Sequence, residues 1–201
     1  MTLRVTAFIL AGGRSSRMGR DKAFLNLGGR SLLERAISTA EAACDRVVLV
    51  GDRERLGKYG VVVEDQYEGQ GPLAGIQAAL TSEFASQWNV ILAVDTPAVP
   101  ATFVEYLIEN ARVSLSVVTV PRVNGYTQPL CAAYRREFAE TAQAALREGR
   151  NKIDPLFAAV PARIVEETEL AVAGFRPDMF DNVNTPEDWE RMQRRMGARQ
   201  P

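Results

Sequence analysis

One stretch near the start of the chain decides its fold, and it reads Val5-Thr6-Ala7-Phe8-Ile9-Leu10-Ala11-Gly12-Gly13-Arg14-Ser15-Ser16-Arg17-Met18-Gly19-Arg20-Asp21-Lys22. The first six residues are apolar or β-branched, which predicts a short buried strand. The double glycine lets the backbone approach a ligand closely, because neither residue carries a Cβ atom. Three arginines and Lys22 follow. Cations and free backbone N–H groups at the carboxyl end of a strand form a site for a polyphosphate.

This loop differs from the two commonest phosphate-binding motifs. It contains neither G-x-x-x-x-G-K-[ST] nor G-x-G-x-x-G. The alternative interpretation is a solvated, arginine-rich surface turn. Such a turn needs neither a buried strand before it nor a double glycine, so we predict a polyphosphate-binding loop.

The loop also resembles a known family signature. Residues 10–22 match Leu-Ala-Gly-Gly-x-Ser-x-Arg-Met-Gly-x-Asp-Lys, which is typical of nucleotidyltransferases that activate sugar phosphates and cofactors with a nucleoside triphosphate. Within that group the chain is most similar to the molybdenum cofactor guanylyltransferases (the MobA family), over nearly its whole length. The resemblance implies a nucleotide-diphospho-sugar-transferase-like fold. It also implies transfer of GMP from GTP to the phosphate of Mo-molybdopterin, with release of pyrophosphate and with Mg²⁺ as cofactor.

The resemblance assigns roles to the residues of the loop. It implies that Lys22 and Arg17 neutralise the triphosphate and the transition state, and that the backbone around Gly12 and Gly13 donates N–H groups. The expected nucleotide contacts of the loop are Leu10, Ala11, Gly12, Gly13 and Lys22, and the expected substrate contacts are Arg17 and Gly19. The attacking phosphate has a second pKa near ~6, so it needs no general base.

The composition is that of an ordinary soluble globular domain and excludes several kinds of chemistry. The chain has 201 residues, of which 46% are hydrophobic and 24% charged, enough for one sizeable core. A formal net charge of −1 argues against a general nucleic-acid binder. The absence of histidine excludes Ser–His–Asp hydrolysis, histidine acid–base catalysis and the usual zinc sites. Phosphoryl or nucleotidyl transfer needs only carboxylates, lysine, arginine, backbone groups and a hard metal ion, so it remains compatible with this composition.

The sequence also suggests where the protein acts. No apolar run approaches the ~20 residues of a membrane span, and no signal-peptide pattern opens the chain. Cys44 and Cys131 lie far apart in apolar segments, so we expect buried, reduced thiols without a disulfide or metal. We expect a cytoplasmic monomer with no nucleic-acid or membrane partner, whose contacts with other molybdenum-cofactor proteins are at most transient.

Strands and helices alternate along the chain. The predicted strands are 5–10, 46–50, 61–63, 90–94, 115–120 and 129–134. Helices are predicted after a Ser31/Glu34 capping box, from Pro72, over 103–111 and 136–146, briefly at Asp154-Pro155, and after Thr185-Pro186. We expect the last helix to bury a stripe of Trp189, Met192 and Met196. This alternation predicts an α/β fold, a single Rossmann-like domain with a mostly parallel twisted sheet and helices on both faces.

The proposed domain covers residues 1–201, with a nucleotide-binding half at about 1–112 and an acceptor-binding half at about 113–196. Ligands of such sheets bind outside the carboxyl ends of the strands. Leu10, Gly51, Asp65 and Asp95 all follow or end predicted strands. We therefore expect them around one crevice.

Asp95 is the candidate metal ligand. It ends the most continuous apolar strand and precedes Thr96-Pro97, several residues before the next predicted helix. A helix cap would stand directly before the helix, so the position favours a Mg²⁺ ligand over a cap. The Asp-Thr-Pro segment also matches the metal-binding aspartate of the family.

Asp65 follows another strand. From the residues alone, a contact to a nucleoside and a cap for the turn are equally plausible. The resemblance implies a nucleotide contact, within the Glu-Asp … Gly-Pro-Leu-Ala-Gly block. The nearby Gly69, Gly71 and Gly75 permit close backbone approach to a base, or serve a turn and helix–sheet packing.

Asn182 and Asn184 flank Val183, so in an extended chain both amides point to one side. The resemblance places this Asn-Val-Asn-Thr-Pro segment near the second substrate, and it places Gln128-Pro129-Leu130 weakly on the same side. The alternative is Asx-turn chemistry before the helix cap at Thr185.

Two departures from the family pattern leave the choice of base open. Ala93-Val94 stands where the guanylyltransferases often carry Pro-Cys, and Gly51-Asp52 stands where an Asn commonly contacts the nucleotide. The alternative enzymes are a relative that uses CTP, which would form a cytosine dinucleotide cofactor, and one with a sugar-phosphate acceptor. The non-enzymatic alternative is a GTP-sensing regulatory protein.

Overall fold

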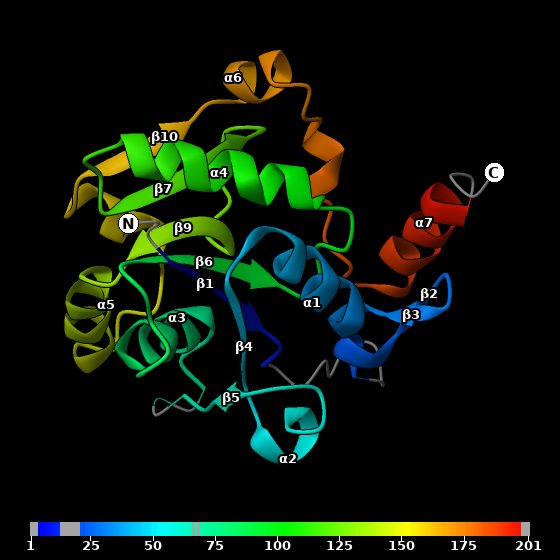
Figure 1. Ribbon diagram of the computed structural model, residues 1–201, viewed down its shortest axis with the longest axis horizontal. Helices are drawn as coiled ribbons and strands as arrows, with labels where there is room; N and C mark the ends of the chain where they lie inside the picture. The colour runs from blue at the N-terminus through cyan, green and yellow to red at the C-terminus, as the bar shows by residue number, and fades with distance from the viewer. Residues whose placement is uncertain (1–3, 13–20, 66, 68, 198–201) are drawn as a thin grey trace.

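The computed structural model describes residues 4–12, 21–65, 67 and 69–197, and eight strands of this part form one sheet (Figure 1). The sheet order is β10-β7-β9-β6-β1-β4-β5, with β8 paired to β7. The strands of this sheet are β1 (Val5–Leu10), β4 (Arg46–Val50), β5 (Val62–Val63), β6 (Trp88–Ala93), β7 (Val118–Val123), β8 (Tyr126–Thr127), β9 (Cys131–Arg135) and β10 (Ala162–Val165). A separate small hairpin joins β2 (Asn26–Leu27) to β3 (Arg30–Ser31).

Most pairs of neighbouring strands are parallel. β1 pairs in parallel with both β4 and β6, β4 with β5, and β7 with β10. Among the strands from β10 to β4 in the sheet order, only β9 is antiparallel to both of its neighbours, β6 and β7. β6 and β7 therefore point the same way, and the carboxyl ends of β1, β4, β5, β6 and β7 lie at one edge of the sheet. The predicted α/β class with a mostly parallel sheet is confirmed.

Helices cover both faces of the sheet (Figure 1). The helices are α1 (Leu32–Ala43), α2 (Arg53–Leu56), α3 (Pro72–Thr81), α4 (Ala101–Val113), α5 (Phe138–Arg147), α6 (Glu167–Val172) and α7 (Pro186–Gly197), with 3₁₀ turns η1 (Lys22–Phe24), η2 (Asp154–Ala158) and η3 (Pro177–Phe180). Residues of β1 alternate between the two cores. Ala7 and Ile9 pack with α1 and α4 on one face, and Phe8 packs with α3 and α5 on the other.

Two helix starts form as their sequence signals predict. The Ser31 hydroxyl accepts from the Glu34 N–H at 3.2 Å, and the Glu34 carboxylate accepts from the Ser31 N–H at 2.7 Å. This reciprocal pair is a capping box, and it also lowers the pKa of Glu34 through the hydrogen bonds from Ser31. Pro72 is the first residue of α3, after Gly71 at φ 70°.

The structure moves several predicted boundaries, in both halves of the chain. β7 begins at Val118 rather than at residue 115, and Leu115 is 91% exposed. β6 runs from Trp88 to Ala93. The strand can include the buried polar Asn89 because its side-chain amide accepts from the Ser86 N–H and donates to the Ser86 carbonyl. The sequence reading missed β2, β3, β8, β10, α2 and α6.

Three side-chain predictions need correction. Cys131 is buried as expected, but Cys44 is only half-buried, because it caps the carboxyl end of α1; both are free thiols. In α7 only Met192 is buried, and Trp189 and Met196 pack around it while partly exposed.

Within the described residues no helix is both long and apolar enough to cross a membrane.

Candidate active site

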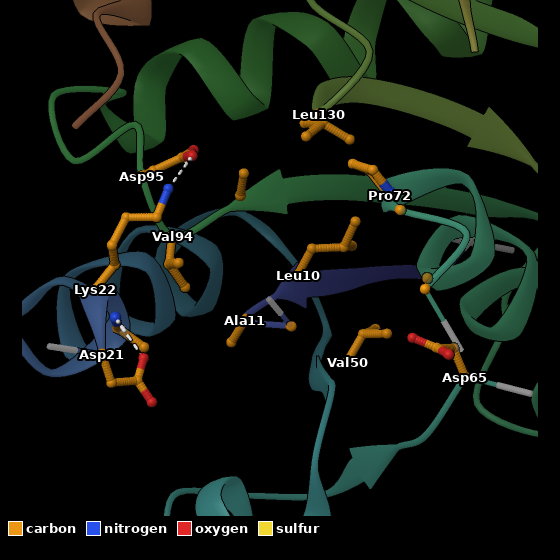
Figure 2. A pocket seen from close by; sticks show the side chains of 16 residues that line it. Leu10, Ala11, Asp21, Lys22, Val50, Asp65, Pro72, Val94, Asp95 and Leu130 are labelled. Carbon is orange, nitrogen blue, oxygen red and sulfur yellow. Dashed lines mark hydrogen bonds and ion pairs between the residues drawn. The ribbon is translucent and has the colours of Figure 1, made fainter. Parts of the chain in front are cut away.

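A cavity of about 430 Å³ opens at the carboxyl ends of β1, β4 and β6, within the size range of small-ligand sites (Figure 2). Its lining residues are Leu10, Ala11, Gly12, Asp21, Lys22, Ala23, Val50, Asp65, Gly69, Gly71, Pro72, Gly75, Ala93, Val94, Asp95 and Leu130. Figure 2 shows Lys22 and Asp95 on one side of the cavity and Asp65 and Pro72 on the other. Apolar Leu10, Val50 and Leu130 lie between them.

All the predicted nucleotide-site residues that the structure describes line this cavity. They are Leu10, Ala11, Gly12, Lys22, Asp65 and Asp95. The expected gathering of strand ends is therefore confirmed, although Val50 rather than Gly51 lines the cavity. Gly13, Arg17 and Gly19 lie outside the described residues, so their predicted roles stay predictions.

Lys22 links two segments that are far apart in the sequence. Its Nζ donates to Asp95 Oδ2 at 3.0 Å and to Asn184 Oδ1 at 2.8 Å. The side chains of Lys22 and Asp95 are 21% and 20% exposed, so their ion pair is less screened than a surface pair. One cation therefore sits between a carboxylate oxygen and an amide oxygen.

Asn184 reaches this position because the segment before α7 is anchored on both sides. The Val183 N–H donates to the Asp95 carbonyl at 2.8 Å, and the Val183 side chain is fully buried against Leu27, Leu32 and Met192. The neighbours of Val183 are exposed, as the alternation predicts. The structure brings Asn184 to Lys22, whereas among the described hydrogen bonds Asn182 makes none with Lys22 or Asp95.

Cap chemistry before α7 involves the backbone of this segment and not the two asparagine amides. Asp188 Oδ2 accepts from the N–H groups of Asn184 at 3.1 Å and Thr185 at 3.0 Å, and Thr185 Oγ1 accepts from the Asp188 N–H at 3.2 Å. Desolvation opposes the charged form of Asp188, but these donors outweigh it and hold the pKa of the carboxyl below its ordinary value. The side chain of Asn184 is thereby left to Lys22.

Asp95 does not cap a helix. α4 begins at Ala101, its cap position is Pro100, and no side chain makes a cap hydrogen bond there. The Asp95 side chain points instead to Lys22 (Figure 2). The cap alternative for Asp95 is therefore wrong.

The oxygens around Lys22 match what a hard cation binds. Asp95 Oδ2 and Asn184 Oδ1 already face one positive charge. Among the described residues no three Asp, Glu or Cys side chains form a metal cage. Mg²⁺ does not require one, since it is commonly held by one or two carboxylates and keeps water or phosphate oxygens as its other ligands. The donor set thus fits Mg²⁺.

The opposite wall of the cavity is built from Asp65 and the glycine-rich turn. Figure 2 shows the Asp65 carboxylate turned toward the cavity from its position after β5. Gly69 and Gly71 have φ of 75° and 70°, conformations that favour glycine, and the space beside them is open. A Cβ at Gly75 would lie 3.4 Å from Leu10, so that glycine serves helix–sheet packing.

Gly51-Asp52 has a structural role in this chain. A Cβ at Gly51 would lie 3.2 Å from the Gly12 nitrogen, so the absence of a side chain lets the end of β4 pass close to Gly12. Asp52 Oδ1 accepts from the Arg55 N–H at 3.2 Å and caps α2. Neither residue lines the cavity.

Sequence reasoning missed two charged residues beside the site. Asp21 belongs to the loop motif but received no role, and Arg55 was not singled out. Asp21 lines the cavity and forms an ion pair with Arg55, 34 positions later. No periodicity or local motif signals a pair at that separation.

Comparison with known proteins agrees with this geometry. The MobA-like NTP transferase domain matches residues 7–163. A probable molybdenum cofactor guanylyltransferase of Carboxydothermus hydrogenoformans is 34% identical over 189 residues, covering 94% of each chain. The molybdenum cofactor guanylyltransferase of Desulfosudis oleivorans is 34% identical over 192 residues, covering 93% of each.

A solved structure extends this agreement to the fold. The molybdopterin-guanine dinucleotide biosynthesis protein A of Archaeoglobus fulgidus superposes with a TM-score of 0.84 at 25% identity, covering 96% of this chain and 99% of the other. The family model, the similar sequences and the similar fold thus all indicate the same family. The chain belongs to the MobA-like NTP transferases and, within them, to the molybdenum cofactor guanylyltransferase family.

Proposed function

We propose that this protein transfers GMP from GTP to the phosphate of Mo-molybdopterin, releasing pyrophosphate and forming the guanine dinucleotide cofactor. The observation that carries the proposal is the Lys22 ammonium held between Asp95 and Asn184 at the strand-end cavity. Family membership supplies the base and the acceptor, because the curated relatives of nearly equal length are guanylyltransferases.

The reaction needs charge stabilisation rather than proton transfer by the protein. An oxygen of the acceptor phosphate forms a new bond to the α-phosphorus of GTP, and the bond from that phosphorus to the bridging oxygen of pyrophosphate breaks. The attacking phosphate is mostly dianionic at neutral pH, so no base has to remove a proton. This agrees with a chain that contains no histidine. Catalysis is then positioning plus neutralisation of negative charge.

The described residues divide these tasks across the cavity. Lys22 and the backbone N–H groups near Gly12 face the position of the triphosphate. Asp65 fixes the nucleoside from the opposite wall, beside the open turn at Gly69 and Gly71. Arg17 and Gly13 are proposed to contribute further positive charge and N–H donors from the same loop.

Mg²⁺ is the proposed cofactor, with Asp95 as its ligand. When bound, it would polarise the phosphate oxygens and stabilise the leaving pyrophosphate. Asn182 and Asn184 are proposed to orient the acceptor. We expect the enzyme to act as a cytoplasmic monomer, with GTP and Mo-molybdopterin as its substrates.

Thermal unfolding in the presence of Mg²⁺ and one nucleotide at a time tests the proposal. A ligand that binds only the native state raises the free energy of unfolding by RT ln(1 + [L]/Kd), about 2.7 kcal/mol at a hundredfold excess over Kd. We expect a clear rise of the midpoint with GTP and little with CTP, ATP or UTP. Pyrophosphate release should then require Mo-molybdopterin. A rise with CTP alone, or release with a sugar phosphate instead, would contradict the proposal.

A further inference from the structure

We propose that α2 braces η1, the turn that carries Lys22, and that Arg55 is a positioning residue that sets the pose of Lys22. The α2 turn lies between β4 and β5 (Figure 1). None of residues 53–59 lines the cavity. Any effect of Arg55 on the reaction must therefore pass through another residue.

That residue is Asp21, which directly precedes Lys22. The guanidinium of Arg55 pairs with Asp21 Oδ2, and the two side chains are only 24% and 30% exposed. Charge-assisted pairs at such partly buried positions are stronger and less screened than those on an open surface. The pair thus holds one oxygen of Asp21 in place.

The other oxygen of Asp21 starts the turn that carries Lys22. Asp21 Oδ1 accepts from the Ala23 N–H at 3.1 Å and caps η1. With the carboxylate plane held by Arg55, the first turn of η1 has one orientation. Lys22 leaves that turn toward Asp95 and Asn184 at 3.0 and 2.8 Å. An unbroken series of contacts therefore runs from Arg55 through Asp21 to the cation of the site.

A second, independent contact joins the same two segments. The Phe24 ring of η1 stacks on Tyr59 just after α2, with centroids 5.6 Å apart and planes 25° apart. The Tyr59 N–H donates to the Leu56 carbonyl at 2.8 Å, so Tyr59 is fixed to the α2 turn. The η1 turn is thus held by an ion pair at one end and an aromatic stack at the other.

The brace itself is fixed to the sheet. The Leu56 side chain is fully buried, and Arg53 donates to the Val62 carbonyl at 3.0 Å and pairs with Glu64 at 3.2 Å. Arg53 and Glu64 are 64% and 54% exposed, so that pair is weak. Arg53 is therefore a matched control: an arginine of the same short helix that pairs with a carboxylate away from Lys22.

Removing the guanidinium of Arg55 has a specific consequence. It leaves the Asp21 carboxylate with the Ala23 N–H but without its ion pair, so the η1 turn that carries Lys22 is less constrained. The Lys22 ammonium then leaves Asp95 and Asn184 more often. Lys22 then spends less time in the position that faces the triphosphate. We expect a lower kcat rather than a failure to fold.

The first test reads the pose of Lys22 without any nucleotide. Wild type and the variants Arg55→Gln, Arg55→Lys and Arg53→Gln are acetylated with a limiting reagent, and the rate at Lys22 is measured by mass spectrometry against the exposed Lys152. We expect Arg55→Gln to raise the relative rate severalfold, Arg55→Lys to restore part of the protection, and Arg53→Gln to change it less than twofold. An unchanged rate at Lys22 in Arg55→Gln would overturn the inference, whatever the substrate proves to be.

The second test rests on the proposed function and uses a double-mutant cycle with Lys22→Gln. We expect Arg55→Gln to lower kcat for GTP-dependent pyrophosphate release about tenfold in the wild-type background and less than twofold in the Lys22→Gln background. Two effects that simply multiply would show that Arg55 does not act through Lys22. Absence of wild-type activity with any acceptor would count against the proposed function instead, and the acetylation result would still decide the role of Arg55. Unfolding midpoints of all variants exclude global destabilisation as the cause.

Discussion

The two halves of the molecule contribute to the cavity in different ways. In the first half, parallel strands end side by side, and residues at or just after these ends, such as Leu10, Val50 and Asp95, line the cavity. From the second half, Leu130 lines the cavity just before the antiparallel β9, and Asn184, in an extended segment before α7, contacts Lys22. Parallel strands thus collect functional groups at one edge by topology alone, whereas the second half needs individually anchored segments.

The two halves also differ in the charge that they bring to the cavity. The charged groups that line the cavity, Asp21, Lys22, Asp65 and Asp95, all belong to the first half. The second half supplies the Asn184 amide that contacts Lys22 and, among the described lining residues, the apolar side chain of Leu130. We therefore expect changes in the first half to abolish the chemistry, and changes in the second half to weaken or redirect it.

The replacement Asp95→Asn should have the largest effect. The amide keeps the size of the side chain and still offers an oxygen to Lys22, but it removes the negative charge that would hold Mg²⁺. Loss of one electrostatic element of a transition state commonly costs about 10²–10³-fold in rate, and we expect at least that loss in pyrophosphate release. Turnover within tenfold of wild type would break the assignment of the charged chemistry to the first half.

Stability provides the control for that variant. Fully exposed ion pairs contribute about 0–1 kcal/mol, and the Lys22–Asp95 pair, one-fifth exposed, should contribute somewhat more. The amide of the variant would keep the hydrogen bond from Lys22, which limits the loss. Asp95→Asn should therefore unfold within a few degrees of wild type. A fully unfolded variant would show that Asp95 mainly serves the fold.

The contrast between the halves also explains how far the sequence could be interpreted. In the first half the central strands β1, β4 and β6 are mostly apolar, and the starts of α1 and α3 carry local signals, the Ser31/Glu34 box and Pro72. The short elements β2, β3 and α2 lack such signals and were missed. Local signals survive because parallel central strands are buried on both faces, which constrains their composition. The strand ends then locate Asp65 and Asp95 by topology.

Signals of the second half depend on distant partners. Residues 115–117 have strand-like composition, but β7 begins only where it pairs with β9 and β10. The strand β10 carries Arg163 in a short segment whose pairing partner is more than 40 residues earlier. The contact between Lys22 and Asn184 spans 162 positions. Such pairings are set by tertiary packing, and a single sequence does not contain them as a pattern.

A matched pair of substitutions, Asn184→Ala and Asn182→Ala, should sharpen the comparison within the second half. Asn184 accepts from Lys22 at 2.8 Å, so its loss removes one of two groups that fix the cation, and we expect about a tenfold lower kcat/KM for GTP. Asn182 makes no such contact among the described hydrogen bonds, and its loss should change only the KM for the acceptor. Steady-state kinetics with each substrate varied separately measures both. Equal effects of the two variants on GTP would show that the segment acts as one unit.

The smallest expected effect concerns the two thiols, one in each half. Burial raises the pKa of Cys131 to about 12, and burial together with the nearby Asp45 raises that of Cys44 to about 12. Only the thiolate reacts with alkylating reagents, so both thiols should react slowly at pH 8. An unfolded thiol ionises near pH ~8.5, while the folded ones keep their protons to about 12. Unfolded thiols release protons first, so the free energy of unfolding should fall as the pH rises above about 9.

The rates of alkylation then test whether the two halves form a single domain, as the sequence predicts. Cys44 caps the end of α1 and is half-buried, so it should react after local fraying of that helix. Cys131 is 2% exposed on β9, the strand that joins β6 of the first half to β7 of the second. If the sheet unfolds cooperatively, Cys131 should be alkylated only at the rate of global unfolding. Urea should then change the alkylation rate of Cys131 and the rate of global unfolding in parallel. A Cys131 that reacts at pH 8 as fast as Cys44, well below the urea midpoint, would mean that β9 separates from β6 on its own. The halves would then be two folding units that share one cavity.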